Sequence, residues 1–270
     1  MMIELESLSV VGRGGDYDPD MQRTAAVTRS LTYPRRGLHG EVVHLIGLRI
    51  LSGELKPGDQ LPPEDELTAD LAVSRTVLRE AVRVLAAKGL VVARPKVGTR
   101  VRPRADWNIL DPDVLSWRAE ASNDILLYEE TTEVRLAIEP LASRLAATRA
   151  SEEETAAIAQ AYGEMEAGLR DQDAYLAADL RFHDRILASC HNELLAHLGV
   201  VLRAVLRTTF EVTTTPSRSR RRALPLHRAI LDEIVAGDED GAEAATRVLI
   251  ADTAADLRRI ARRNGGRLRP

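Results

Sequence analysis

Residues 70–91 read DLAVSRTVLREAVRVLAAKGLV, and this stretch decides the fold of the first half of the chain. Arg75, Arg79 and Arg83 recur every four residues, so on a helix they form one cationic stripe. Apolar side chains recur on another face of the same helix, at Leu78, Ala81, Val82 and Leu85. The pattern predicts a short amphipathic helix that packs on one side and offers cations on the other.

The residues before this helix predict a helix-turn-helix. A first helix fits residues 41–51, where apolar side chains lie on one side. Residues 53–67, GELKPGDQLPPEDEL, are rich in Gly and Pro and lead into a second short helix near residues 64–71. Ser74 is a residue type that caps helix N-termini, so we expect it to cap the helix that begins at Arg75.

The residues after this helix predict a small β-hairpin. Beyond Gly89, the run LVVARPKVGTRVRP contains two extended segments, residues 90–94 and 99–102. Pro95 and Gly98 occupy the turn between them. A hairpin next to the second helix of a helix-turn-helix is a wing.

Basic charge is concentrated in this region, although the whole chain has a formal net charge of -4. Between residues 73 and 104, nine basic residues stand against Glu80 alone, whereas acidic clusters follow beyond Trp107. A solvated charged face is one interpretation of such a run. The other is a polyanion-binding module joined to a separate domain, and the charge difference between the two halves favours it.

Length and composition indicate two largely helical domains. A chain of 270 residues with 44% hydrophobic content can form two cores, and its 3% aromatic content and lack of alternating β-branched runs favour helix. Cys190 is the only cysteine, which excludes an internal disulfide. No apolar run reaches membrane-spanning length or resembles a signal peptide, so we expect a cytoplasmic protein that does not contact membranes.

The second half of the chain predicts helix after helix. Helix start signals are Asn123 before an apolar run and a capping box from Ser151 to Glu154. Six helices are expected, at roughly 124–148, 151–170, 172–189, 192–213, 219–236 and 239–263. Residues 1–36 show no sustained periodicity, and we expect them to form a flexible arm.

Residues 51–101, LSGELKPGDQLPPEDELTADLAVSRTVLREAVRVLAAKGLVVARPKVGTRV, resemble the GntR family of transcription regulators. The second half resembles the FCD ligand-binding domain of the fatty-acid-regulator branch, through EVRLAIEPLASRLAA (133–147), DLRFHDRILASCHNELL (179–195) and LHRAILDEIVAGD (226–238). The resemblance covers about residues 38–262 and implies a mainly α fold, a winged helix-turn-helix followed by an all-helical bundle. The expected domains are an N-terminal arm at 1–36, the DNA-binding domain at 37–104, a linker with a first short helix at 105–122, and the FCD domain at 123–264.

The family resemblance implies how the first domain binds double-stranded DNA. Residues at the start of the second helix reach base edges in the major groove. Arg75 and Arg79 suit this role because a guanidinium donates two hydrogen bonds to guanine, whereas the short donors beside them suit phosphates. The wing tip lies over the minor groove or the backbone. The expected DNA-contacting residues are Ser74, Arg75, Thr76, Arg79, Lys96 and Gly98.

The sequence departs from the family at two positions that face DNA. Family members often have Arg where this chain has Asp65, which removes one expected phosphate contact. The wing usually has Gly where this chain has Lys96, which changes the expected geometry of its tip.

Asp179 and His183 are four residues apart, so on a helix they share a face. Taken alone, such a pair is either surface chemistry or part of a metal site. The FCD resemblance implies that both are metal ligands, together with His227. The family's fourth ligand is typically a His in the last helix, and the nearest equivalent here is Asp252. Two imidazoles and two carboxylates suit zinc, with nickel or manganese as alternatives.

Arg135 is followed one helical turn later by Glu139. One interpretation is an intrahelical ion pair of little energy. The other is that Arg135 enters the bundle and holds the carboxylate of an effector bidentately beside the metal. The family resemblance favours the second.

The resemblance implies a ligand-responsive repressor rather than an enzyme. The segment DWNILDPDVLSW, residues 106–117, is typical of the branch that controls sugar-acid catabolism, so galactonate or a related aldonate is the expected effector. A homodimer should bind a palindromic operator and release it when the effector favours the DNA-incompetent state. The alternatives are a regulator that responds to another small organic acid or to the metal itself, and a metal-dependent hydrolase fused to a DNA anchor.

Overall fold

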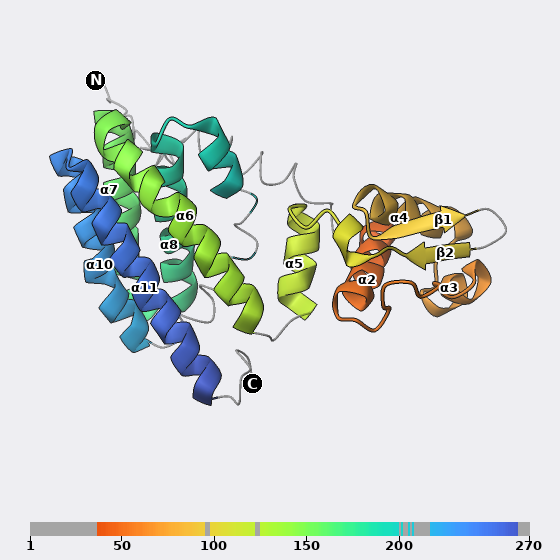
Figure 1. Ribbon diagram of the computed structural model, residues 1–270. Coiled ribbons are helices and arrows are strands. Elements are labelled where there is room, and N and C mark those ends of the chain that lie inside the picture. Colours follow the sequence, from red (N-terminus) through yellow and green to blue (C-terminus); the bar gives the residue numbers. More distant parts are fainter. Residues whose placement is uncertain are drawn as a thin grey trace, which may run out of the picture. The chain divides into compact units, whose positions relative to one another are not determined.

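The computed structural model describes residues 37–94, 98–121, 125–199, 201, 205, 207 and 217–263. Its elements are α2 (Leu38–Leu51), α3 (Glu64–Asp70), α4 (Arg75–Ala87), β1 (Val91–Arg94), β2 (Gly98–Val101), α5 (Pro112–Ala121), α6 (Ile125–Arg149), α7 (Glu152–Ala167), α8 (Gln172–Ser189), α10 (Ser217–Ala236) and α11 (Glu239–Arg263) (Figure 1). Short 3-10 turns occupy Arg104–Asp106 and Gly168–Arg170. The expected mainly helical class is confirmed.

Some expectations lie outside the described residues. They are the N-terminal arm at 1–36, the wing-tip residue Lys96 and the helix start at Asn123. Of the helix expected at 192–213, residues 193–199 are described and helical, together with residues 201, 205 and 207. The expected domain boundaries stay predictions.

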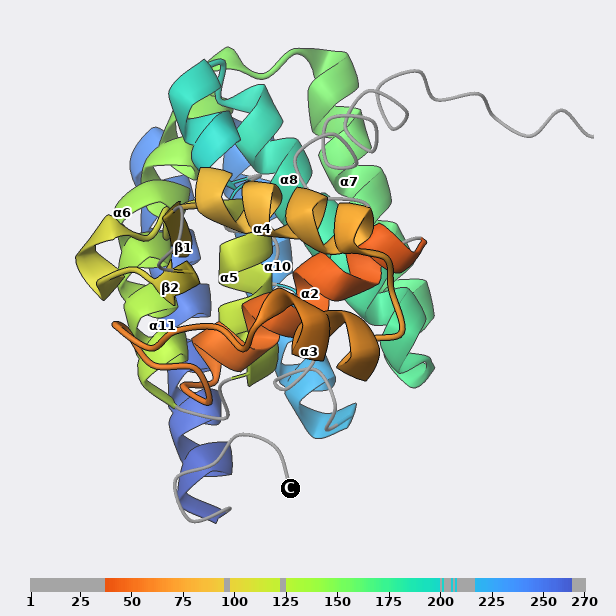
Figure 2. The same ribbon diagram turned by 90° about the vertical axis from the view of Figure 1, so that its right-hand side faces the viewer.

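Three short helices and a hairpin form the predicted winged helix-turn-helix. α4 packs against both α2 and α3, and the three helices lie together in Figure 2. Ser74 caps α4 as predicted, because its Oγ accepts a hydrogen bond from the backbone N–H of Val77 at 3.3 Å. β1 and β2 pair antiparallel, with Val91 opposite Val101. α2 begins at Leu38, earlier than the expected residue 41.

Gly89 ends α4 in the left-handed region, at φ 76°. A Cβ at this position would lie 2.4 Å from the carbonyl oxygen of Asp106, so only glycine fits. The preceding residue, Lys88, belongs to the basic run of the sequence, but its side chain is buried. Its ammonium group forms ion pairs with Asp111 at 2.9 Å and Asp113 at 2.6 Å. Lys88 therefore adds no cation to the DNA-facing surface.

The short helix α5 packs against α2. Its Trp117 is buried and lies over Gly47, where an added Cβ would come within 2.5 Å of the indole ring. At the start of α5, Asp111 accepts hydrogen bonds from the backbone N–H groups of Asp113 and Val114 at 2.9 and 3.3 Å. The close packing of indole on glycine fixes α5 to the helix-turn-helix.

Among the described residues of the second half, α6, α7, α8, α10 and α11 are the long helices, and they pack against one another (Figure 1). The predicted capping box is confirmed at the start of α7, where Ser151 and Glu154 bond reciprocally at 3.1 and 2.8 Å. The core between these helices is apolar and includes Ile158, Met165, Tyr175, Phe182, Ile186, Ile230 and Leu249. Within the described part of the chain, no helix has the length and apolarity that crossing a membrane requires.

Candidate functional site

The N-terminal part of α4 exposes the arginines expected to read DNA. The side chains of Arg75 and Arg79 are 64% and 65% exposed. Ser74 and Thr76 are exposed beside them. Gly98 starts β2 with φ 101°, a conformation that favours glycine, and it is also exposed. The five described members of the expected DNA-contacting set are thus all accessible.

Two acidic side chains of α3 hold these arginines, which the sequence did not reveal. Asp65 Oδ1 lies 2.7 Å from Arg75 Nη2. Glu64 accepts two hydrogen bonds from Arg79, at 2.6 and 3.0 Å. Exposed ion pairs contribute only about 0–1 kcal/mol. Because the pairs are weak, they leave both guanidinium groups available for the expected contacts with DNA.

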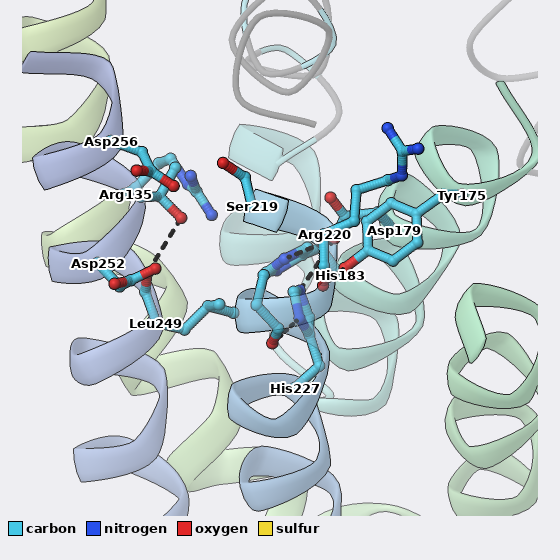
Figure 3. A pocket seen from close by; sticks show the side chains of 12 residues that line it. Arg135, Tyr175, Asp179, His183, Ser219, Arg220, His227, Leu249, Asp252 and Asp256 are labelled. Carbon is cyan, nitrogen blue, oxygen red and sulfur yellow. Dashed lines mark hydrogen bonds and ion pairs between the residues drawn. The ribbon is translucent and has the colours of Figure 1, made fainter. Parts of the chain in front are cut away.

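Asp179, His183 and His227 meet in the interior of the helical half, as the family resemblance implies. Asp179 and His183 lie one turn apart on α8 and His227 comes from α10, and all three are buried. One ligand atom of each lies within 4.8 Å of the others, and among the described residues they are the group able to hold a metal ion (Figure 3). The ligands come from two helices and converge on one point.

The inward-facing atoms of this cluster are better placed to bind a cation than to form hydrogen bonds with one another. His227 Nε2 is 3.0 Å from Asp179 Oδ1, and His183 Nε2 is 3.5 Å from the same oxygen. Despite its short distance, the first contact lacks hydrogen-bond geometry, so Asp179 Oδ1 and His227 Nε2 have no hydrogen-bond partner in the described part of the chain. Buried polar atoms without partners are rare, and a metal ion would satisfy both.

The outer nitrogens of both imidazoles are held by acceptors. His183 Nδ1 lies 3.2 Å from Glu139 Oε2. His227 Nδ1 lies 2.9 Å from the backbone carbonyl of Ala223. A ring that donates its Nδ1 proton outward presents the lone pair of Nε2 inward, which is the tautomer that a metal requires. The geometry therefore orients both rings for ligation through Nε2.

Arg135 lines the same cavity and also pairs with Glu139. Its Nε and Nη2 donate to the two Glu139 oxygens at 2.6 and 3.1 Å, and only 1% of Arg135 is exposed. The Arg135–Glu139 ion pair, one of the two interpretations of the sequence, is therefore present, but it is buried rather than solvated. Because the guanidinium also lines the cavity, both interpretations of Arg135 remain compatible with its position.

Asp252 stands on α11, across the cavity from Asp179 and His227 (Figure 3). It does not join the cluster of three ligands among the described residues. Its carboxylate accepts two hydrogen bonds of 3.0 Å from Arg222, which also pairs with Asp256. Arg222 is the partner that sequence reasoning missed, because it contacts Asp252 across two helices. The structure thus brings three of the expected ligands together, and the fourth stays a prediction.

The cavity between these residues is partly open to solvent, and its inner space for water-sized groups is small, about 30 Å³. Such a volume holds an ion with one or two water-sized groups. A six-carbon acid is larger than this inner space.

Without a metal, the cluster binds a proton tightly. Burial lowers the pKa of His183, but the adjacent carboxylates of Glu139 and Asp179 outweigh burial and raise it from 6.5 to about 9. Burial opposes the charged form of Asp179 too, yet His227 and His183 hold its pKa well below the usual range. At neutral pH the imidazolium of His183 thus stands where a metal would bind.

Metal affinity is therefore expected to rise with pH up to about 9, where His183 loses its proton. The displacement of one proton makes the rise about tenfold per pH unit. Competition of zinc between the protein and a chromophoric chelator, at a series of pH values, measures it. A plateau beginning near the ordinary His pKa of 6.5 would contradict this account of the cluster.

A winged helix-turn-helix with exposed arginines, followed by a helical domain that encloses a polar cavity, defines a two-part DNA-binding regulator. Residues 38–101 match the bacterial regulatory proteins of the gntR family, and residues 130–252 match the FCD domain. The chain belongs to the GntR family of transcription regulators and carries an FCD domain. Its relatives are transcription regulators, and the chain is a regulator rather than an enzyme.

Individual relatives extend this similarity over most of the chain. The galactonate operon transcriptional repressor of Escherichia coli (strain K12) is 37% identical over 220 residues, covering 81% of this chain and 96% of that protein. The HTH-type transcriptional regulator LutR of Bacillus subtilis is 30% identical over 201 residues, covering 73% and 90%. The structure of Lar, which controls the expression of the Listeria monocytogenes agr system, shares the fold with a TM-score of 0.61 at 19% identity, covering 84% and 100%.

Proposed function

We propose that this protein represses genes of sugar-acid catabolism and releases its operator when galactonate or a related aldonate binds. The similarity over most of both chains to a galactonate operon repressor supports this choice. The single observation that carries the proposal is the cavity lined by Arg135, Asp179, His183 and His227. A guanidinium beside potential metal ligands suits an acid with neighbouring hydroxyl groups.

A divalent metal ion, zinc in first place and nickel or manganese as alternatives, would be held by Asp179, His183 and His227. It would supply a Lewis-acidic centre for a carboxylate or hydroxyl oxygen of the effector. Asp252 would serve as a fourth ligand after release from Arg222. Arg135 would contact the effector carboxylate.

In this proposal, effector binding is coupled to release of DNA through a change between a closed and an open state of the cavity. We infer that α10 and α11 separate when an aldonate binds, so that it binds an open state better than the closed one. A ligand shifts an equilibrium only by its difference in affinity for the two states, and an effector excluded from the closed state has a large difference. The open state is then the DNA-incompetent one.

The DNA target is a short inverted repeat bound by a homodimer in the cytoplasm. One recognition helix contacts too few bases for selectivity, and a two-fold protein matches a palindrome. Val134 and Leu141 on α6 and Val248 on α11 are exposed, and these two helices pack against each other. Exposed apolar side chains on neighbouring helices are suited to contact with a second copy of the chain.

The test is a gel shift on the protein's own promoter region with metal-loaded protein and a panel of sugar acids and other small organic acids. We expect a shift that aldonates abolish at lower concentrations than the other acids. Equal DNA binding with every acid, at concentrations well above physiological levels, would contradict the proposed effector class.

Arg79→Ala is expected to weaken operator binding by about 1–3 kcal/mol and to relax base preference, because a bidentate contact with guanine is lost. Binding to operator and random DNA of equal length, at fixed salt, measures both effects. Arg83→Ala is the matched control on the same helix, and Lys96→Ala should weaken all sequences about equally. Equal losses on operator and random DNA for Arg79→Ala would show a purely electrostatic role.

A second candidate signal is the metal itself, because the small inner space of the cavity suits an ion better than a six-carbon acid. In that case, metal alone changes operator affinity. A gel shift of chelator-treated protein, with metal added back in the absence of any acid, separates this candidate from the first.

A further inference from the structure

Glu139 is a buried carboxylate beside the metal cluster, but it is not one of the three converging ligands. It lies on α6, a different helix from any of them, and is 4% exposed. Its two oxygens accept from Arg135 at 2.6 and 3.1 Å, and Oε2 also lies 3.2 Å from His183 Nδ1. The three candidate ligands thus lie on α8 and α10. The third helix, α6, contributes a charged carboxylate that faces one of them, His183.

The two imidazoles differ in the acceptor that faces their outer nitrogen, Nδ1. Behind His227 stands the neutral carbonyl of Ala223, one turn earlier on the same helix, at 2.9 Å. Behind His183 stands an ionised carboxylate from another helix. A carboxylate accepts the Nδ1 proton more strongly than a carbonyl does and makes the opposite nitrogen a better donor to a metal. The outer contacts thus make His183 the stronger ligand.

Arg135 stabilises the charge of the buried Glu139 carboxylate. An ionised carboxylate buried without partners is strongly unfavourable. The bidentate pair with Arg135 satisfies both Glu139 oxygens and fixes the plane of the carboxylate, so that Oε2 stays directed toward the ring. Neither residue is exposed enough for solvent to replace this contact.

We propose that Glu139 is a positioning residue for the metal ligand His183, held in place by Arg135. This inference rests on the proposed metal site. It assigns to the Arg135–Glu139 pair a role in metal affinity that is separate from any contact between Arg135 and an effector. The sequence showed only that the two residues are one turn apart on a helix.

The test measures zinc affinity of the full-length Glu139→Gln variant by chelator competition. Glutamine keeps the length of the side chain and an acceptor oxygen but loses the charge. Outer-shell changes of this kind weaken metal binding by about 10–100-fold, and we expect a loss in that range. With cobalt in place of zinc, the visible absorption spectrum should also change, because the orientation of the His183 ring relaxes. A merely structural role would not move that spectrum.

Two further variants keep the result interpretable. Glu243→Gln removes another Glu–Arg pair at the same helical spacing, with Arg247 at 2.8 Å and away from the cluster, and it should bind zinc like the wild type. Glu139→Asp keeps the charge for Arg135 but withdraws the oxygen from the ring, so it should lose affinity even if Glu139→Gln does not fold. Wild-type zinc affinity in a folded Glu139 variant would overturn the positioning role alone. Wild-type protein that binds no metal would overturn the metal site as well.

Discussion

Replacing His183 and His227 together with alanine is expected to abolish metal binding at the proposed site and, with it, the proposed response to sugar acids. The two imidazoles supply two of the three converging ligand atoms, and Asp179 alone cannot hold the ion. Because outer-shell changes alone cost about 10–100-fold in affinity, the loss of two inner ligands must cost more. DNA binding without effector should stay close to that of wild-type protein, since α2–α4 have their own buried core.

Elemental analysis after gel filtration measures the metal, and gel shifts with and without aldonate measure the response. The matched control is the double replacement of His191 and His197, which are exposed and lie outside the cluster. That variant should keep both metal and response. If the His183 and His227 variant still releases DNA at wild-type effector concentrations, the metal takes no part in the response.

Local signals predicted the elements of this fold well, because caps and breakers act over a few residues. Ser74 and the capping box at Ser151 mark helix starts, and α8 and α11 have the predicted bounds. The predicted start of α2, residue 41, was wrong. No side chain caps the observed start at Leu38, so no local signal in the sequence marks it. Helix ends without a cap depend on tertiary packing, which a pattern of residues does not contain.

The site was predictable only in part, for a related reason. Spacing placed Asp179 and His183 on one face, but only the family resemblance joined His227 to them across two helices. The contacts of Glu139 with His183 and of Arg222 with Asp252 link different helices, at sequence separations that no periodicity records. Asp65 shows the same limit. The sequence predicted only that it removes a phosphate contact, whereas its carboxylate forms an ion pair with Arg75 of the next helix.

Lys88→Met is expected to destabilise the DNA-binding half by several kcal/mol. Lys88 is 8% exposed, and it donates to both oxygens of Asp111 at 2.9 Å and contacts Asp113 at 2.6 Å. Its ammonium also lies 5.8 Å from the centre of the Trp117 ring. Removing one partner of a buried ion pair typically costs about 3–5 kcal/mol, because the opposite charge stays buried without compensation. Asp111 keeps some access to water, so the lower end of that range is expected.

Thermal unfolding of the full chain followed by circular dichroism measures this loss, with limited proteolysis between α4 and α5 as a local readout. The triple variant Lys88→Met, Asp111→Asn and Asp113→Asn tests the cause, because it removes every charge of the cluster while asparagine retains the helix cap. Its stability should exceed that of Lys88→Met alone, since no uncompensated charge remains. Both variants should bind DNA when folded, because the arginines expected to read bases lie in the N-terminal half of α4, away from Lys88. Wild-type stability of Lys88→Met would mean that water replaces the ammonium freely and that the link between α4 and α5 depends on Trp117 instead.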